Sequence, residues 1–83
     1  MLQGFCIDAI KAVPELTAEL CLPEEGYMNV DLFRNERKIA EIYIVSRNEG
    51  SVLAMFSFDG EKEVGDEFYF SEHQEGIRIL KDI

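Results

Sequence analysis

Apolar residues recur at three- and four-residue spacing over the first thirteen positions, which is the period of an amphipathic helix. The polar positions Gly4, Asp8 and Lys11 fall on the opposite side of that helix. Pro14 ends it, because a proline has no amide hydrogen and pushes the preceding residue out of the helical region. The predicted buried face is Leu2, Phe5, Cys6, Ala9, Ile10 and Val13.

After Pro14 the hydrophobic period changes to two, which predicts a chain of strands. Residues 15–22 favour a strand, with a second short helix as the alternative, since Leu16 and Leu20 are also one helical turn apart. A turn at residues 23–26 leads into a strand that includes Met28, Val30 and Leu32. Residues 38–45 form the most strand-like run, and Ile42–Val45 is apolar on both faces, as expected for a central strand.

The rest of the chain predicts further strands. A turn at residues 47–50 precedes an alternating strand over residues 51–58. Asp59 and Gly60 break this strand, and the charged stretch up to Asp66 is predicted to be a loop or a single helical turn. Residues 68–70 and 77–80 are predicted to close the chain as a terminal hairpin.

The predicted fold is therefore a single α+β domain spanning residues 1–83, in which one N-terminal amphipathic helix packs on an antiparallel meander of five to six strands. One short helix cannot cover both faces of such a sheet. Either the sheet curls into a half-barrel, or a second chain covers the remaining apolar face. By alternation, that partner-binding or self-binding face holds Tyr43, Leu53, Met55 and Tyr69.

Charge changes this picture more than any motif does. Seventeen Asp and Glu residues oppose eight Lys and Arg, for a net charge of −9. The excess lies in two segments, residues 8–31 and 59–75, which flank a nearly neutral and apolar middle. Such a surface attracts basic partners and repels phosphate, so we expect no direct binding to nucleic acid or to an anionic membrane.

No motif indicates a reaction. His73 is the only histidine and lies in a polar stretch that predicts a solvent-exposed loop. Cys6 and Cys21 are spaced for neither a metal site nor a redox site and are expected to be small buried apolar residues. The glycines form no phosphate-binding loop. We expect a non-enzymatic protein with no catalytic residues, no cofactor and no metal.

The second acidic segment supplies the candidate binding residues. In an extended segment, alternate side chains on one face are about 6.6 Å apart, so Asp59, Glu61 and Glu63 could form a short row of negative charge. Such a row suits a groove built for a phosphate backbone. The full predicted acidic site is Asp59, Glu61, Glu63, Asp66, Glu67, Glu72 and Glu75.

In size and charge the chain is similar to small acidic inhibitors that imitate nucleic acid, such as the phage-encoded inhibitor of uracil-DNA glycosylase and several anti-CRISPR proteins. The similarity is one of composition and involves no shared motif. It implies an inhibitor that docks on the basic, nucleic-acid-binding surface of a target protein. The alternatives are an immunity protein that neutralises a toxin and a homo-oligomeric accessory subunit without catalytic activity, and an enzyme acting on a small molecule ranks last.

Two features that the sequence lacks indicate where in the cell the protein is expected. The first thirteen residues lack the basic start of a signal peptide, and no run approaches the ~18 apolar residues of a membrane helix. We therefore expect a soluble cytoplasmic protein, with a homodimer as one possible state.

Overall fold

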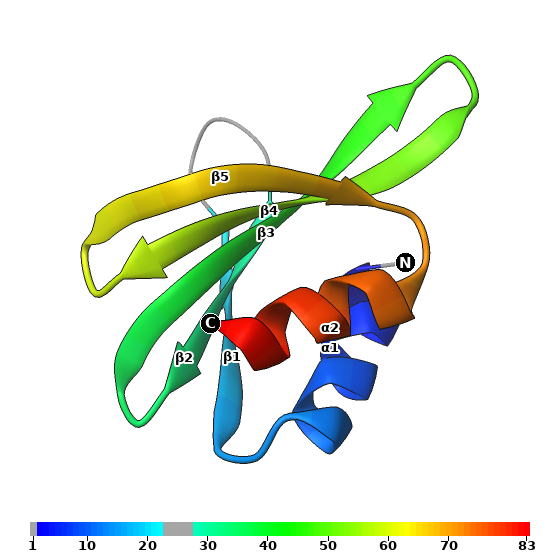
Figure 1. The fold of residues 1–83 in the computed structure, drawn as a ribbon. Helices are drawn as coiled ribbons and strands as arrows, with labels where there is room; N and C mark the ends of the chain where they lie inside the picture. Colours follow the sequence, from blue (N-terminus) through cyan, green and yellow to red (C-terminus); the bar gives the residue numbers. More distant parts are fainter. Residues whose placement is uncertain (1, 23–27) are drawn as a thin grey trace.

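The computed structural model describes residues 2–22 and 28–83 (Figure 1). The turn predicted at residues 23–26 lies outside these residues. The described part of the chain forms two helices and five strands: α1 (Leu2–Ala12), β1 (Leu16–Cys21), β2 (Asn29–Arg34), β3 (Arg37–Arg47), β4 (Gly50–Asp59), β5 (Lys62–Phe70) and α2 (His73–Asp82). The predicted α+β class is confirmed.

Helix α1 buries the predicted apolar face with one exception. Phe5 and Ala9 are fully buried, whereas Ile10 is exposed, so its assignment to the buried face was wrong. Ile10 lies at the rim of a stripe centred on Phe5 and Ala9, and the sheet does not reach that rim. The Val13 amide still donates to the Ala9 carbonyl at 2.9 Å before Pro14 ends the helix.

The five strands form one antiparallel sheet in the order β1-β2-β3-β4-β5. Residues Leu16–Cys21 are a strand, which settles the choice between strand and helix that the pattern left open. The β2–β3 turn has two residues, Asn35 and Glu36, both with positive φ (53° and 67°). Two such residues match the right-handed twist of the flanking strands in a tight hairpin.

The segment predicted to be a loop, between Asp59 and Asp66, is instead a tight turn followed by most of β5. Asp59 pairs with Lys62 across the turn, and Phe56 pairs with Glu67 farther along. β5 is charged because it is an edge strand, which needs apolar side chains only where it meets the core.

The terminal hairpin predicted for residues 77–80 is also wrong, because this segment belongs to helix α2. Ile77 and Leu80, one helical turn apart, are buried against the core, as is Gly76. A side chain at Gly76 would overlap ring atoms of Phe70 and Phe5, so the helix can dock this closely only with glycine there. Packing, rather than the strand preference of isoleucine, decides the conformation.

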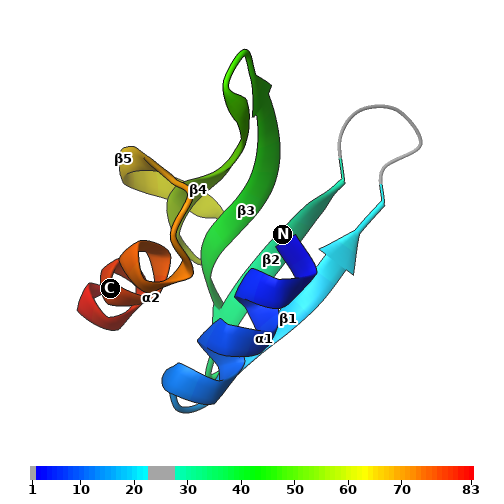
Figure 2. The ribbon, with the colours of Figure 1, turned by 90° about the vertical axis from the view of Figure 1, so that its right-hand side faces the viewer.

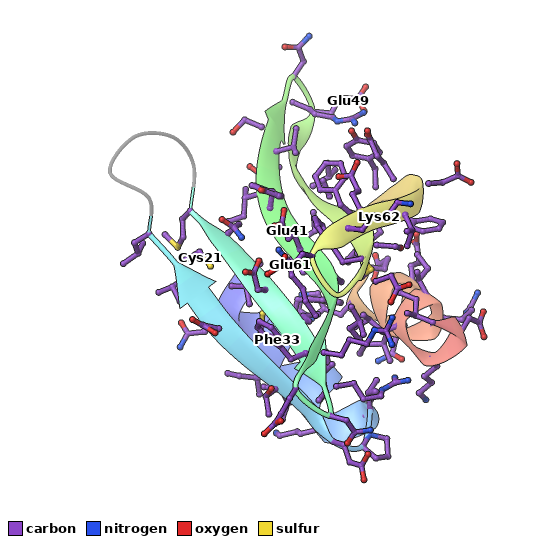
Figure 3. The ribbon with its side chains drawn as sticks, turned by 90° about the vertical axis from the view of Figure 1, so that its left-hand side faces the viewer. Cys21, Phe33, Glu41, Glu49, Glu61 and Lys62 are labelled. Carbon is purple, nitrogen blue, oxygen red and sulfur yellow. The ribbon has the colours of Figure 1, made fainter. Side chains whose placement is uncertain are left out.

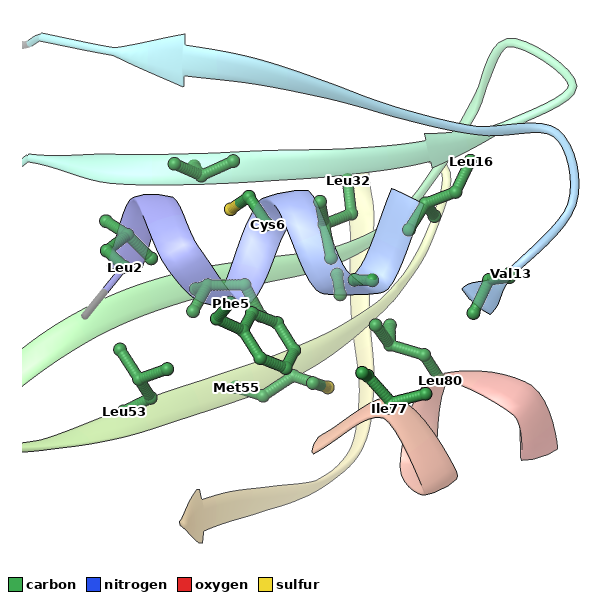
Figure 4. Close-up of a cluster of buried hydrophobic side chains, with 14 of the residues drawn as sticks. Leu2, Phe5, Cys6, Val13, Leu16, Leu32, Leu53, Met55, Ile77 and Leu80 are labelled. Atoms are coloured by element: carbon green, nitrogen blue, oxygen red, sulfur yellow. The ribbon is translucent and has the colours of Figure 1, made fainter. Parts of the chain in front are cut away.

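Both helices lie on the same face of the sheet, and the sheet is not closed into a barrel (Figure 2). α1 contacts β1, β3 and α2, and α2 contacts β5. The core lies between the helices and the sheet, where Phe5, Leu32, Ile42, Leu53, Met55 and Leu80 are fully buried (Figure 4). No described helix or strand covers the other side, which we call the open face.

Candidate surface for protein interaction

The open face of the sheet carries a set of compensated charges and aromatic rings (Figure 3). Lys38, near the start of β3, has its Nζ 3.4 Å from Asp31 Oδ1 and forms a salt bridge with Glu41. The three side chains are only 17%, 15% and 19% exposed. The Lys38 ammonium also sits 4.0 Å from the centroid of the Phe58 ring, a favourable cation–π position.

Ionisation on this face follows from that arrangement. Burial alone would lower the pKa of Lys38, but the hydrogen bonds and negative charges of Glu41 and Asp31 outweigh it, and the pKa is raised. Burial, together with the hydrogen bond to Glu41, raises the pKa of Tyr43 to about 12. Lys38 is therefore charged and Tyr43 neutral at physiological pH.

The predicted apolar face of Tyr43, Leu53, Met55 and Tyr69 needs correction. Tyr43 and Tyr69 do lie on the open face, but Leu53 and Met55 are fully buried beneath the helices. The reason is the two-residue turn between β3 and β4, which pairs Ile42 with Met55 and Tyr43 with Ala54. Even-numbered positions of β3 therefore share a face with odd-numbered positions of β4.

All seven predicted acidic residues are exposed, but they do not form the predicted row. Asp59 is the last residue of β4, Glu61 lies in the turn, and Glu63 lies on β5, which runs in the opposite direction to β4. The chain therefore reverses where the row needed it to continue. Asp59 also makes a salt bridge with Arg37, in which the side chains are 53% and 63% exposed.

The other six carboxylates differ from Asp59. Within residues 2–22 and 28–83, the structure shows no ion pair for any of them. They follow the outer strand and the helix start that comes directly after it (Figure 1). We call this surface the acidic edge: Glu61, Glu63, Asp66, Glu67, Glu72 and Glu75.

A register shift shapes the acidic edge. Phe56 pairs with Glu67 and Phe58 with Glu63, so three residues of β5 stand opposite the single residue Ser57. Gly65, within this bulge, has φ 73°, a value that glycine adopts without strain. The bulge leaves Val64–Asp66 exposed along the edge.

His73 is not the solvent-exposed loop residue that the sequence predicted. It begins α2, its Nδ1 lies 2.7 Å from Asp8 Oδ2, and its ring packs edge-on against Phe5. It thus joins the two helices across 65 positions of sequence. No local pattern could have revealed this contact.

The two cysteines are free thiols, Cys6 buried and Cys21 half-buried. Burial raises the pKa of both thiols, and at Cys21 the neighbouring Asp31 raises it further. Both are therefore poor nucleophiles at physiological pH. Among the described residues, no cluster of three His, Cys, Asp or Glu side chains is arranged to bind a metal ion.

Comparison of the chain with protein-family models, with curated proteins and with solved structures gives no match in any of the three. In the part of the chain that the structure describes, no helix has the length and apolar character needed to cross a membrane.

Proposed function

We propose that this chain is a small acidic interaction module that docks on the basic surface of another protein, and that it acts as an inhibitor where that surface binds nucleic acid. The observation that best supports this is the difference between its two sets of carboxylates. Asp31 and Glu41 on the open face are compensated by Lys38, whereas no described residue forms an ion pair with a carboxylate of the acidic edge. An uncompensated edge attracts a basic partner and steers its approach.

The proposed role is non-enzymatic. Acid–base catalysis by carboxyl groups needs two of them in different environments within a cleft, so that their pKa values separate. The carboxylates of the acidic edge are all exposed instead. Exposure is suited to binding, because it leaves each charge available to a partner.

The test is a pull-down with the tagged chain from a lysate of the source organism or its host, washed in parallel at low and high salt. Three proteins are compared: the wild type and two triple variants with equal net charge. The edge variant carries Glu61→Gln, Glu63→Gln and Asp66→Asn. The control variant loses three exposed carboxylates elsewhere, through Glu19→Gln, Glu49→Gln and Asp82→Asn.

The proposal predicts one stoichiometric basic partner that the wild type and the control variant retain at low salt and lose at high salt. The edge variant should retain about tenfold less, because three exposed ion pairs contribute ~0.2–1 kcal/mol each. Equal retention by the two variants would contradict the proposal. So would recovery of the chain alone at either salt concentration.

A homo-oligomeric accessory subunit is the second candidate, and exposed apolar side chains on the α1 side favour it. Ile7 and Ile10 are 46% and 45% exposed and lie one turn apart on α1, and Leu20 on β1 is 55% exposed. If this surface joins two copies, Ile10→Lys should convert a dimer to a monomer in analytical ultracentrifugation. A wild-type protein that is already monomeric at high concentration would remove this candidate.

A further inference from the structure

The two edges of the sheet differ in how they are protected against pairing with a further strand. β5 is rich in charged residues and is interrupted by the bulge around Gly65. β1 pairs with β2 without a register shift from Leu16 to Cys21, and Glu19 is its only charged residue. Among residues 2–22 and 28–83, no strand pairs with the outer side of β1. Because charges and bulges are what keep an edge strand from pairing with another chain, β1 lacks the protection that β5 has.

The side chains of β1 are exposed on the same face of the sheet that holds the core. Ala18 lies opposite Leu32 and Leu20 lies opposite Val30, and both partners on β2 are buried beneath the helices. The even-numbered residues of β1 therefore point to the helix side. Leu16 is buried there, but Ala18 is exposed and Leu20 is 55% exposed. The helices thus leave most of this apolar row uncovered.

Helix α1 exposes an apolar side chain towards the same edge. Asp8 points to His73 of α2, and α2 contacts β5 (Figure 2). Ile10 lies about 200° around the helix axis from Asp8, so it points away from α2 and towards the β1 side of the molecule, where it is 45% exposed. A strand added beside β1 would therefore meet apolar side chains of both layers, Leu20 of the sheet and Ile10 of the helix.

β1 itself has the pattern that such a strand needs. In an antiparallel pair, residues that lie opposite each other both turn their backbone groups towards the partner strand or both turn them away. Two copies of β1 can therefore pair only about a residue that lies opposite its own copy, and Ala18 and Glu19 are the two central choices. Centring on Glu19 places two carboxylates directly opposite each other, which is unfavourable. Centring on Ala18 places Leu16 opposite Leu20 of the second copy, and Thr17 opposite Glu19 of the second copy.

We propose that β1 pairs antiparallel with β1 of a second copy, centred on Ala18, so that two five-stranded sheets become one continuous sheet. The strand order places β5 at the opposite edge from β1, so the dimer leaves both acidic edges free. The net charge of −9 on each chain opposes association, and salt screens this repulsion. Self-association should therefore strengthen with salt, whereas docking through the acidic edge weakens. The inference goes beyond the docking function and does not rest on it.

The first test is analytical ultracentrifugation of the full chain over a range of concentrations, at low and at high salt. The proposal predicts a reversible dimer with a dissociation constant in the micromolar range at high salt, and association about tenfold weaker at low salt. A chain that is monomeric at both salt concentrations would overturn the proposal and would leave this edge to a strand of another protein. Association that salt weakens would also overturn it.

Charged substitutions at the two edges locate the interface. Leu20→Lys should weaken the dimer about tenfold or more, because it buries an ammonium opposite Leu16 of the second copy. Val64→Lys adds the same charge at an exposed position of β5 and should leave the dimer unchanged or slightly tighter. Thr17→Lys should tighten it about threefold more than Val64→Lys does, because the new ammonium lies opposite Glu19 of the second copy. Equal effects of Leu20→Lys and Val64→Lys would overturn the proposal, and the amide spectrum of each variant shows whether the fold is retained.

Disulfide formation tests the register. Opposite Cα atoms in an antiparallel pair are ~4.5–5.5 Å apart, which is within the range that a disulfide spans. With Cys21→Ser in the background to remove the half-buried thiol, Ala18→Cys should give a covalent dimer with oxidised glutathione. Glu19→Cys in the same background should give much less, because Glu19 lies opposite Thr17 in this register. Equal or greater cross-linking by Glu19→Cys would overturn the pairing centred on Ala18.

The dimer and the docking function fail independently. The edge variant, which changes only Glu61, Glu63 and Asp66, should dimerise at least as well as the wild type because it carries less negative charge. If the chain is monomeric while the edge variant still loses its partner in the pull-down, the β1 dimer is wrong and the docking function stands. If the chain forms the β1 dimer while the edge and control variants retain equal amounts of partner, the docking function is wrong and the dimer stands.

Discussion

The two faces of the sheet differ most clearly at neighbouring positions on the same pair of strands. On the face beneath the helices, Ile42 lies opposite Met55, and both are fully buried. One position along, Glu41 lies opposite Phe56 on the open face, where a carboxylate, a lysine and aromatic rings are partly exposed together. The first pair contributes to stability, whereas the second leaves polar and aromatic groups available for binding.

The comparison also separates charges that stabilise the fold from charges that are free to bind. Lys38 compensates the charges of Asp31 and Glu41 on the open face. These two carboxylates therefore add little to the electrostatic field around the protein. The acidic edge has no such compensation among the described residues. The proposed docking function therefore assigns the contact with a basic partner to β5 and the start of α2.

The largest expected contrast in stability is between a core position on β4 and an exposed position on β5. Leu53→Ala should lower the free energy of unfolding by ~2–5 kcal/mol, because it leaves a cavity in a fully buried site. Tyr69→Ala, at a residue that is 47% exposed, should lower it by about 1 kcal/mol or less. Urea unfolding of both variants measures the difference, and equal losses would show that the faces have been assigned the wrong way round.

The next largest expected loss of stability concerns the packing of α2 against the core. Gly76→Ala should lower the free energy of unfolding by ~1–3 kcal/mol, because the new methyl group overlaps the rings of Phe70 and Phe5. Gln74→Ala, at an exposed position of the same helix, is the control and should be neutral or slightly stabilising. A stabilising Gly76→Ala substitution would contradict the close approach of α2 to the core.

Two cations at adjacent positions test the charges of the open face. Lys38→Met should cost ~1–3 kcal/mol, since it leaves Asp31 and Glu41 partly buried without their cation. Arg37→Met breaks the exposed pair with Asp59 and should cost ~0–1 kcal/mol. Restoring stability in Lys38→Met by adding Asp31→Asn would confirm the cause, and equal costs for the two single variants would refute it.

Raising the pH into the alkaline range gives the smallest expected loss of stability from groups on this face. The pKa values of Lys38 and Tyr43 are raised in the folded chain, that of Tyr43 from 10.0 to about 12. A raised pKa means that the folded state holds its proton more tightly, so this stability is fully present below about pH 10 and is lost as the pH rises towards 12. Chemical unfolding at stepped pH should show this decline, and Tyr43→Phe should make it shallower. An identical slope in the variant would contradict the shift.

The alternation of apolar and polar residues predicted most of the strands, but it predicted only in part which side chains lie on which face of the sheet. Periods of two marked β1–β4, and the helical period marked α1. The face of β4 was assigned wrongly because each turn resets the relation between residue number and face. Arg47 pairs with Gly50 across a two-residue turn, so even positions meet odd ones. Turn length and bulges must be known before Leu53 or Met55 can be placed.

The candidate site was predictable only as a list of residues. The excess charge of residues 59–75 is evident in the sequence, and all seven acidic residues are exposed. Which of them are compensated depends on contacts such as that of Arg37 with Asp59, which no local pattern shows. Helix α2 did have a local signal, the spacing of Gly76, Ile77 and Leu80 on one helical face, which the predicted terminal hairpin did not use.

The most direct test of the central claim is an NMR titration of the wild-type chain with short polylysine at low salt, followed residue by residue. If the acidic edge is the binding surface, the shifts should concentrate on β5 and the first turn of α2, and the edge variant should lose most of them. Shifts of equal size around α1 and β1 would show that net charge alone attracts cations, and the account would then be wrong.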